Sequence, residues 1–150
     1  MTNKFIKTMP ITLQIKKVVA SAIRVAISYE KLTNRKLGIT GEVGEVLVCS
    51  HKKLKEKGLK LSSNPILAGY DAIDKNGKQY QIKAKQSDRG SLSRFSNHKF
   101  DVVIVAVFDT NYKIKELWRA SYKKLEPLIA GHKRRNPSLP EFKRVAKEIL

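Results

Sequence analysis

Apolar residues recur every three or four positions over residues 10–34, which predicts a long amphipathic helix. Pro10 suits its first turn and Thr8 is the expected cap. A second helix is expected over residues 41–57, capped by Thr40 and stopped by Gly58. The buried stripe expected for the first helix consists of Ile11, Ile15, Val18, Val19, Ala22, Ile23, Ala26 and Ile27.

Further along the chain, several segments have the pattern of β-strands. Residues 61–67 are expected to form a first strand with a break at Asn64-Pro65. Residues 101–109 are an almost unbroken apolar run, which is typical of a central strand buried on both faces. Residues 113–119 should return as the next strand. A short helix capped by Ser121 and ending near Pro127, and a last helix from Pro140 through Leu150, complete the expected elements.

Residues 69–85 predict a β-hairpin. Strands over residues 70–74 and 79–85 flank Asn76-Gly77, because both turn residues tolerate a positive φ. The two-residue period separates the second strand into a face with Gln79, Gln81, Lys83 and Lys85 and a face with Tyr80, Ile82 and Ala84.

Asp71 on the first strand of this hairpin can therefore meet Gln81 and Lys83 on the second. A carboxylate, an amide oxygen and an ammonium would converge there, a set that can hold a divalent metal and a phosphate. The alternative is an exposed sheet edge with solvated lysines.

Composition favours a nucleic-acid partner. The 150 residues suffice for one domain with a core, and 31 Lys and Arg against 13 acids give a net charge of +18. The single Cys49 excludes an internal disulfide and a cysteine-based zinc site. The absence of a signal-like or membrane-spanning apolar run predicts a soluble, cytoplasmic protein without a membrane partner.

Acidic and basic residues outside the hairpin add further candidates. Glu42 and Glu45 lie three residues apart on the second predicted helix, where the helix dipole explains Glu42 in the first turn but not the deeper Glu45. A long polar loop over residues 86–99 and a basic cluster after Gly131 are both expected to contact phosphates, unless they are merely solvated. The candidate DNA-binding residues are Lys85, Arg89, Arg94, Lys99, Lys133, Arg134 and Arg135.

Three of these features, in this order, resemble the PD-(D/E)xK nuclease superfamily. They are the Gly-x-x-Gly-Glu segment ending at Glu45, then Asp71, then Gln81-Ile82-Lys83. The superfamily usually has an acid at the position of Gln81, so the chain resembles a branch with Gln-x-Lys in place of Glu-x-Lys. The resemblance implies one restriction-endonuclease-like α/β domain, a sandwich with a central mixed β-sheet flanked by helices. Its motif core would cover about residues 38–120, followed by a basic helical extension over residues 121–150.

The activity implied by the resemblance is metal-dependent hydrolysis of DNA by an endonuclease. Glu45, Asp71 and Gln81 would hold Mg²⁺ or Mn²⁺, with Glu42 as the second choice for the helical ligand, and Lys83 would stabilise charge or orient the attacking water. Lys85 would contact a neighbouring phosphate. Enzymes of this family often act as homodimers, although the sequence identifies no interface. Two other functions stay open: a catalytically inactive nucleic-acid-binding module, and a basic structural protein of a nucleoprotein assembly.

Overall fold

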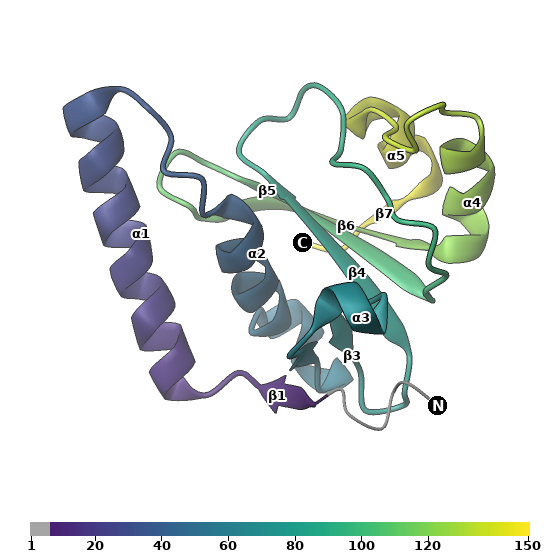
Figure 1. The fold of residues 1–150 in the computed structure, drawn as a ribbon, viewed down its shortest axis with the longest axis horizontal. Helices are drawn as coiled ribbons and strands as arrows, with labels where there is room; N and C mark the ends of the chain where they lie inside the picture. Colours follow the sequence, from purple (N-terminus) through teal and green to yellow (C-terminus); the bar gives the residue numbers. More distant parts are fainter. Residues whose placement is uncertain (1–6) are drawn as a thin grey trace.

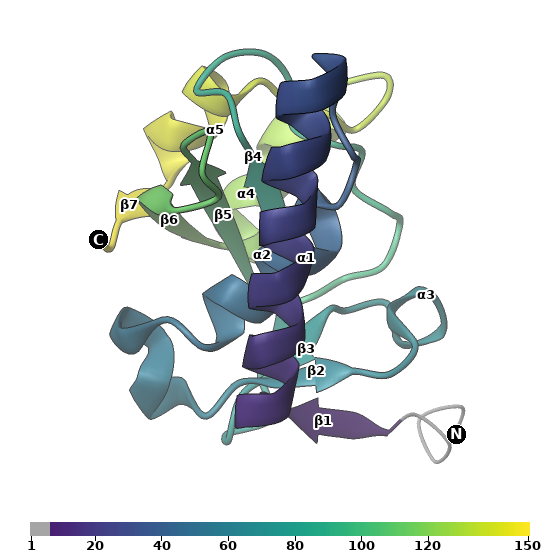
Figure 2. The same cartoon turned by 90° about the vertical axis from the view of Figure 1, so that its left-hand side faces the viewer.

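The computed structural model describes residues 7–150, which form one seven-stranded mixed β-sheet with helices on both faces (Figures 1 and 2). The strands lie in sequence order across the sheet, and β4 and β5 are the one parallel pair of neighbours among these residues. This confirms the predicted α/β class. The strands are β1 (Thr8–Pro10), β2 (Lys60–Ser62), β3 (Ala72–Ile73), β4 (Gln79–Lys85), β5 (Val102–Phe108), β6 (Ile114–Ser121) and β7 (Lys147–Glu148).

Strand β5 lies at the centre of the molecule and is buried along its whole length, as its apolar run predicted. Its alternate residues enter two cores. Ile104 and Phe108 pack on the face covered by α2 (Thr40–Cys49). Val103 and Val105 pack on the opposite face, against α4 (Tyr122–Ala130), α5 (Leu139–Val145) and part of the loop after β4.

Helix α1 (Leu13–Thr33) begins later than predicted, because residues 8–10 pair with β2 as strand β1. Its cap is Thr12, whose hydroxyl oxygen accepts a hydrogen bond from the Ile15 N–H at 3.2 Å, and not Thr8. The predicted stripe is buried only in part. Ala26 is fully buried, whereas Val18 is 63% exposed, since only one face of α1 rests on the rest of the molecule (Figure 1).

The predicted second helix is two shorter ones. α2 ends at Cys49, and the 3₁₀ helix η2 (Lys52–Lys57) follows. The break occurs where His51 starts the new helix by accepting a hydrogen bond from the Lys53 N–H through Nδ1, at 3.1 Å. Thr40 is the first helical residue and not the cap. Gly58 ends the segment with a φ of 62°, as predicted.

The segment predicted as a first strand is strand only at its start, in β2. Asn64 instead caps a short helix, α3 (Pro65–Ala68), by accepting a hydrogen bond from the Leu67 N–H at 3.1 Å. Pro65 occupies the first turn, where its missing N–H costs no hydrogen bond.

Both C-terminal helices differ from their predicted bounds. Ser121 caps α4 as predicted, but the helix continues past Pro127 to Ala130. Helix α5 starts with a capping box formed by Ser138 and Glu141, and it stops at Val145 instead of reaching Leu150. The chain then turns extended and pairs with β6 as strand β7.

Candidate active site

The predicted hairpin is present as β3 and β4, with Ala72 opposite Tyr80, but β3 covers only Ala72–Ile73 of the expected residues 70–74. Of the two turn residues, Gly77 alone adopts a positive φ, so Asn76 does not have the conformation expected of it. Asp74 organises the turn instead. Its Oδ1 accepts hydrogen bonds from the N–H groups of Asn76 at 2.8 Å and Lys78 at 2.9 Å. Asp74 is therefore a turn residue.

Asp71 lies directly before β3 and is tied to the next strand. Its Oδ2 accepts a hydrogen bond from the Ile82 N–H at 2.8 Å, between the positions of Gln81 and Lys83. The Gln81 side chain donates through Nε2 to the Gly69 carbonyl at 3.0 Å, which holds this amide beside the same segment. Local pairing within the hairpin thus brings two of the predicted ligands together.

Glu45 approaches Asp71 and strand β4 from helix α2. Gly44 makes the approach possible, because a Cβ at this position would overlap Ala84 Cβ and lie 3.4 Å from the Phe108 ring. Burial, followed by the negative charge of Asp71, raises the pKa of the Glu45 carboxyl to about 8. Glu42 is exposed in the first turn of α2.

Lys83 completes the cluster. Burial lowers the pKa of its ammonium, while the charges of Asp71 and Glu45 act in the opposite direction. Burial also raises the pKa of Asp71, against the hydrogen bond from Ile82. The structure therefore places Glu45, Asp71 and Lys83 near enough for their charges to interact at a partly buried position, with Gln81 beside them.

The loop after β4 contacts Lys83, which the sequence did not indicate. Lys83 Nζ donates to the Arg94 carbonyl at 2.9 Å and lies 4.6 Å from the centroid of the Phe95 ring. Lys85 Nζ donates to the Ser91 carbonyl at 2.8 Å. Phe95 is buried in the second core, and its one sequence signal is an aromatic ring in a mostly polar loop.

The same loop also reaches the segment before β3. Gly69 has a φ of 77°, and a Cβ there would lie 2.6 Å from Cγ of His98. Because Gly69 has no side chain, the imidazole of His98 fits against it. The carbonyl of Gly69 is the one that accepts the hydrogen bond from Gln81. His98 is exposed, yet it lies near the candidate site.

The predicted DNA-binding residues divide into groups. Arg94, Lys133 and Arg134 line one hollow of about 590 Å³ together with Asn136. Within residues 7–150 the cations with an acidic partner inside 4.0 Å are Lys36, His132 and Lys143, and none of them lies in this hollow. Arg89 and Lys99 are exposed elsewhere on the loop.

Arg135 differs from its basic neighbours. Its guanidinium donates through Nε to the Phe95 carbonyl at 3.2 Å and through Nη2 to the Ser96 carbonyl at 2.9 Å. Its side chain is therefore bound to the loop.

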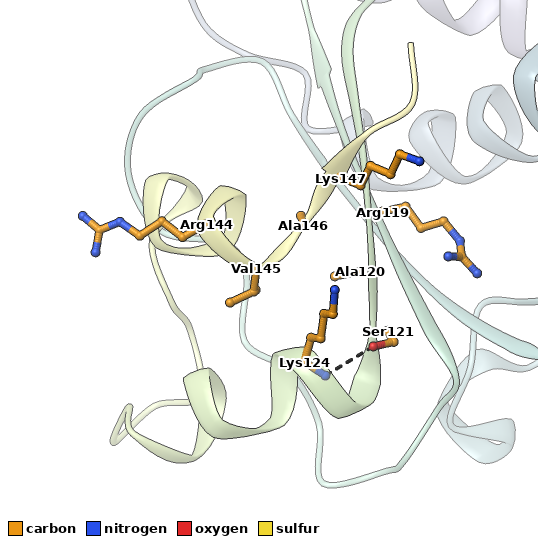
Figure 3. A pocket seen from close by; sticks show the side chains of 8 residues that line it. All are labelled: Arg119, Ala120, Ser121, Lys124, Arg144, Val145, Ala146 and Lys147. Carbon is orange, nitrogen blue, oxygen red and sulfur yellow. Dashed lines mark hydrogen bonds between the residues drawn. The ribbon is translucent and has the colours of Figure 1, made fainter.

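A second basic hollow, of about 480 Å³, lies between β6, β7 and the C-terminal helices (Figure 3). Lys124 points into it, but Arg144 points away, and Arg119 and Lys147 extend toward another side (Figure 3). These cations diverge, and none of the candidate catalytic residues lines this hollow.

The candidate ligands are two carboxylates and one amide. Over the part of the chain that the structure describes, no group of three His, Cys, Asp or Glu side chains is placed to hold a metal ion.

Over the same part, no helix is long and apolar enough to cross a membrane. Neither the models of known protein families nor the curated proteins give a match to this chain.

Proposed function

We propose that the protein is a metal-dependent DNA endonuclease with a restriction-endonuclease-like fold. The observation that carries the proposal is the meeting of Asp71, Glu45 and Lys83 at one strand end. A partly buried group of interacting ionisable side chains with shifted pKa values is typical of a functional site. Their order in the sequence resembles that of the PD-(D/E)xK superfamily, in a branch with Gln81 in place of the usual acid.

The side chains suit a divalent cation. Burial, and then the negative charge of Asp71, raise the pKa of Glu45 to about 8, and a bound cation would favour the ionised form of both carboxylates. Mg²⁺ favours oxygen ligands and usually takes only one or two protein carboxylates, with waters and phosphate oxygens completing its shell. Asp71, Glu45 and the amide oxygen of Gln81 are therefore a sufficient set, with Mn²⁺ as a substitute.

The chain's own residues have separate tasks in this mechanism. When bound, the cation would polarise the phosphoryl group and activate a water. The Ile82 N–H orients the Asp71 carboxylate through its bond to Oδ2. Lys83 has three N–H donors, of which one is bound to the Arg94 carbonyl. The others can donate to a phosphate oxygen as its negative charge grows in the transition state.

The hollow of Arg94, Lys133 and Arg134 supplies the contact to the DNA backbone. Its cations have no acidic partner within 4.0 Å, so they can bind phosphates without first breaking an ion pair. Arg94 also joins the hollow to the catalytic group, because its carbonyl holds Lys83. A strand bound in the hollow would thus pass close to the Lys83 ammonium.

Cleavage assays with plasmid, linear duplex, single-stranded and branched DNA, in Mg²⁺, Mn²⁺ or EDTA, test this proposal. We expect cleavage in Mg²⁺ or Mn²⁺ and none in EDTA. Glu45→Ala and Asp71→Ala should each abolish it, whereas Glu42→Ala is the matched control and should retain most activity. Cleavage that persists in EDTA, or in Asp71→Ala, would contradict the mechanism. Binding without any cleavage would favour an inactive binding module, the alternative that Gln81 suggests.

A further inference from the structure

The loop after β4 is fastened to the segment after α4 by main-chain hydrogen bonds. The Leu92 N–H donates to the Pro137 carbonyl at 2.9 Å, and the Phe95 N–H donates to the Arg135 carbonyl at 3.0 Å. Ser91 and Ser138 form an isolated β-bridge. The loop therefore has a fixed course over this face of the sheet.

Arg135 adds a second attachment at the same place. Its carbonyl accepts a hydrogen bond from the Phe95 N–H, and its guanidinium donates to the carbonyls of Phe95 and Ser96. One residue therefore binds a donor and two acceptors of the loop backbone. It does so with a φ of 53°, a left-handed conformation that is uncommon outside glycine. Such a conformation persists when surrounding contacts hold it in place.

Lys83 is bound to the stretch of loop that Arg135 holds. Its Nζ donates to the carbonyl of Arg94, one residue before Phe95, and lies over the Phe95 ring. An unbroken set of contacts thus runs from the Arg135 guanidinium through residues 94–96 to the Lys83 ammonium. The side chain of Arg134, by contrast, lines the basic hollow.

We propose that Arg135 is a positioning residue that fixes residues 94–96 and, through them, the ammonium of Lys83. Two adjacent arginines then have different tasks, since Arg134 contacts DNA and Arg135 orders the catalytic lysine. The catalytic consequence rests on the proposed nuclease function, whereas the ordering of the loop does not.

The two bonds require the planar fork of arginine. A guanidinium has donors spaced to reach two successive carbonyls, whereas an ammonium is a point charge on a flexible stem. Without the fork, residues 94–96 gain freedom and Lys83 loses its fixed position. A misplacement of about 1 Å at a catalytic group can reduce the rate on the order of 100-fold.

Arg135→Ala and Arg134→Ala form a matched pair, because each removes one arginine from adjacent positions. We expect Arg135→Ala to lower kcat by about 10- to 100-fold with little change in DNA affinity. Arg134→Ala should weaken DNA binding by no more than about threefold, since one phosphate contact is lost, and it should lower kcat far less than Arg135→Ala does. Arg135→Lys keeps the charge but lacks the fork, and it should not restore kcat. Equal effects of the two alanine variants on kcat and affinity would overturn the proposal.

Hydrogen exchange of the backbone amides of residues 92–98 tests the ordering without DNA. Exchange should be faster in Arg135→Ala and Arg135→Lys than in the parent, and unchanged in Arg134→Ala. Urea unfolding shows which variants keep the fold, and Arg135→Lys serves if Arg135→Ala does not fold. Unchanged loop exchange in a folded Arg135 variant would overturn the proposal. Faster exchange with no cleavage even by the parent would support the ordering and refute the nuclease function instead.

Discussion

Two carboxylates of the same site differ in how the protein supports their charge. Asp71 accepts a hydrogen bond from the Ile82 N–H, which favours its ionised form. Glu45 is held near Asp71 by α2, and burial together with that neighbouring charge raises its pKa to about 8. In the absence of a cation, Glu45 is therefore the member of the pair that keeps its proton at neutral pH.

This difference predicts a pH dependence of the metal-free protein. The pKa of Glu45 is about 8 when folded against 4.5 when unfolded, so the native state binds the extra proton between these values. The contribution of Glu45 to stability is complete below pH 4.5 and declines until about pH 8. Urea unfolding in EDTA at pH 5, 6.5 and 8 should show a decline in the parent that is reduced in Glu45→Gln.

The lowered pKa of His51, caused by burial and then by the neighbouring lysines, contributes in the opposite direction near neutral pH. The effect of His51 is common to the parent and Glu45→Gln, so the difference between their stability curves reports on the interacting pair of Glu45 and Asp71. Parallel stability curves for the parent and Glu45→Gln would show that Glu45 does not share a buried site with Asp71.

The hairpin pattern and its two-residue period predicted that Asp71, Gln81 and Lys83 lie together, whereas Glu45 was assigned from the resemblance of the Gly-x-x-Gly-Glu segment to the superfamily. The contacts that hold Lys83 could not be predicted in this way. Phe95 lies in a loop without regular structure, and Arg135 is separated by 39 or more residues from the carbonyls that it binds. Hydrogen bonds of this kind form only when the fold brings two distant loops together, and no local sequence pattern predicts them.

At the scale of elements, the close contact between α2 and β4 decides where Glu45 lies. Gly44 faces Ala84 and Phe108, whereas Gly41 in the same helix has open space around it. Both glycines have helical neighbours and neither has a positive φ. Replacing each of them by alanine therefore separates the effect of packing from the effect of helix propensity on stability.

Gly44→Ala should destabilise the protein by about 1–2 kcal/mol, because overpacking costs about 1–3 kcal/mol and the gain in helix propensity offsets up to about 1 kcal/mol. Gly41→Ala should be neutral or stabilise by at most about 1 kcal/mol. Urea unfolding measures both. Equal stabilities of the two variants would mean that the helix does not approach the sheet as closely as described.

Other elements departed from their predicted bounds because tertiary pairing prevailed over local pattern. Residues 8–10 suit a helix start but join β2 as an edge strand. The helical pattern after Pro140 continues to Leu150, yet residues 147–148 pair with β6. The strongly apolar β5 and the hairpin strand β4 were predicted well, since burial and the two-residue period there agree with the final structure.

At the scale of the whole molecule, basic residues are spread along the chain, whereas the proposed catalytic residues are few and lie together. The net charge is +18, and the ion pairs within residues 7–150 involve only Lys36, His132 and Lys143 as cations. DNA affinity should therefore depend on many residues, each with a small share. The proposed reaction depends instead on the single ammonium of Lys83, whose charge interacts with those of Asp71 and Glu45.

Cleavage of supercoiled plasmid by Lys83→Met, in Mg²⁺ and with the enzyme in excess, separates these two properties most directly. DNA affinity by gel shift should stay within about threefold of the parent, since one charge among many is lost. The cleavage rate should fall by about 100- to 1,000-fold, the usual effect of losing one preorganised electrostatic contact in the transition state. Lys85→Met, on the same strand face, is the control and should lose much less. If Lys83→Met cleaves as fast as the parent, residues 69–85 are not the active site and a basic nucleic-acid-binding protein is the better account.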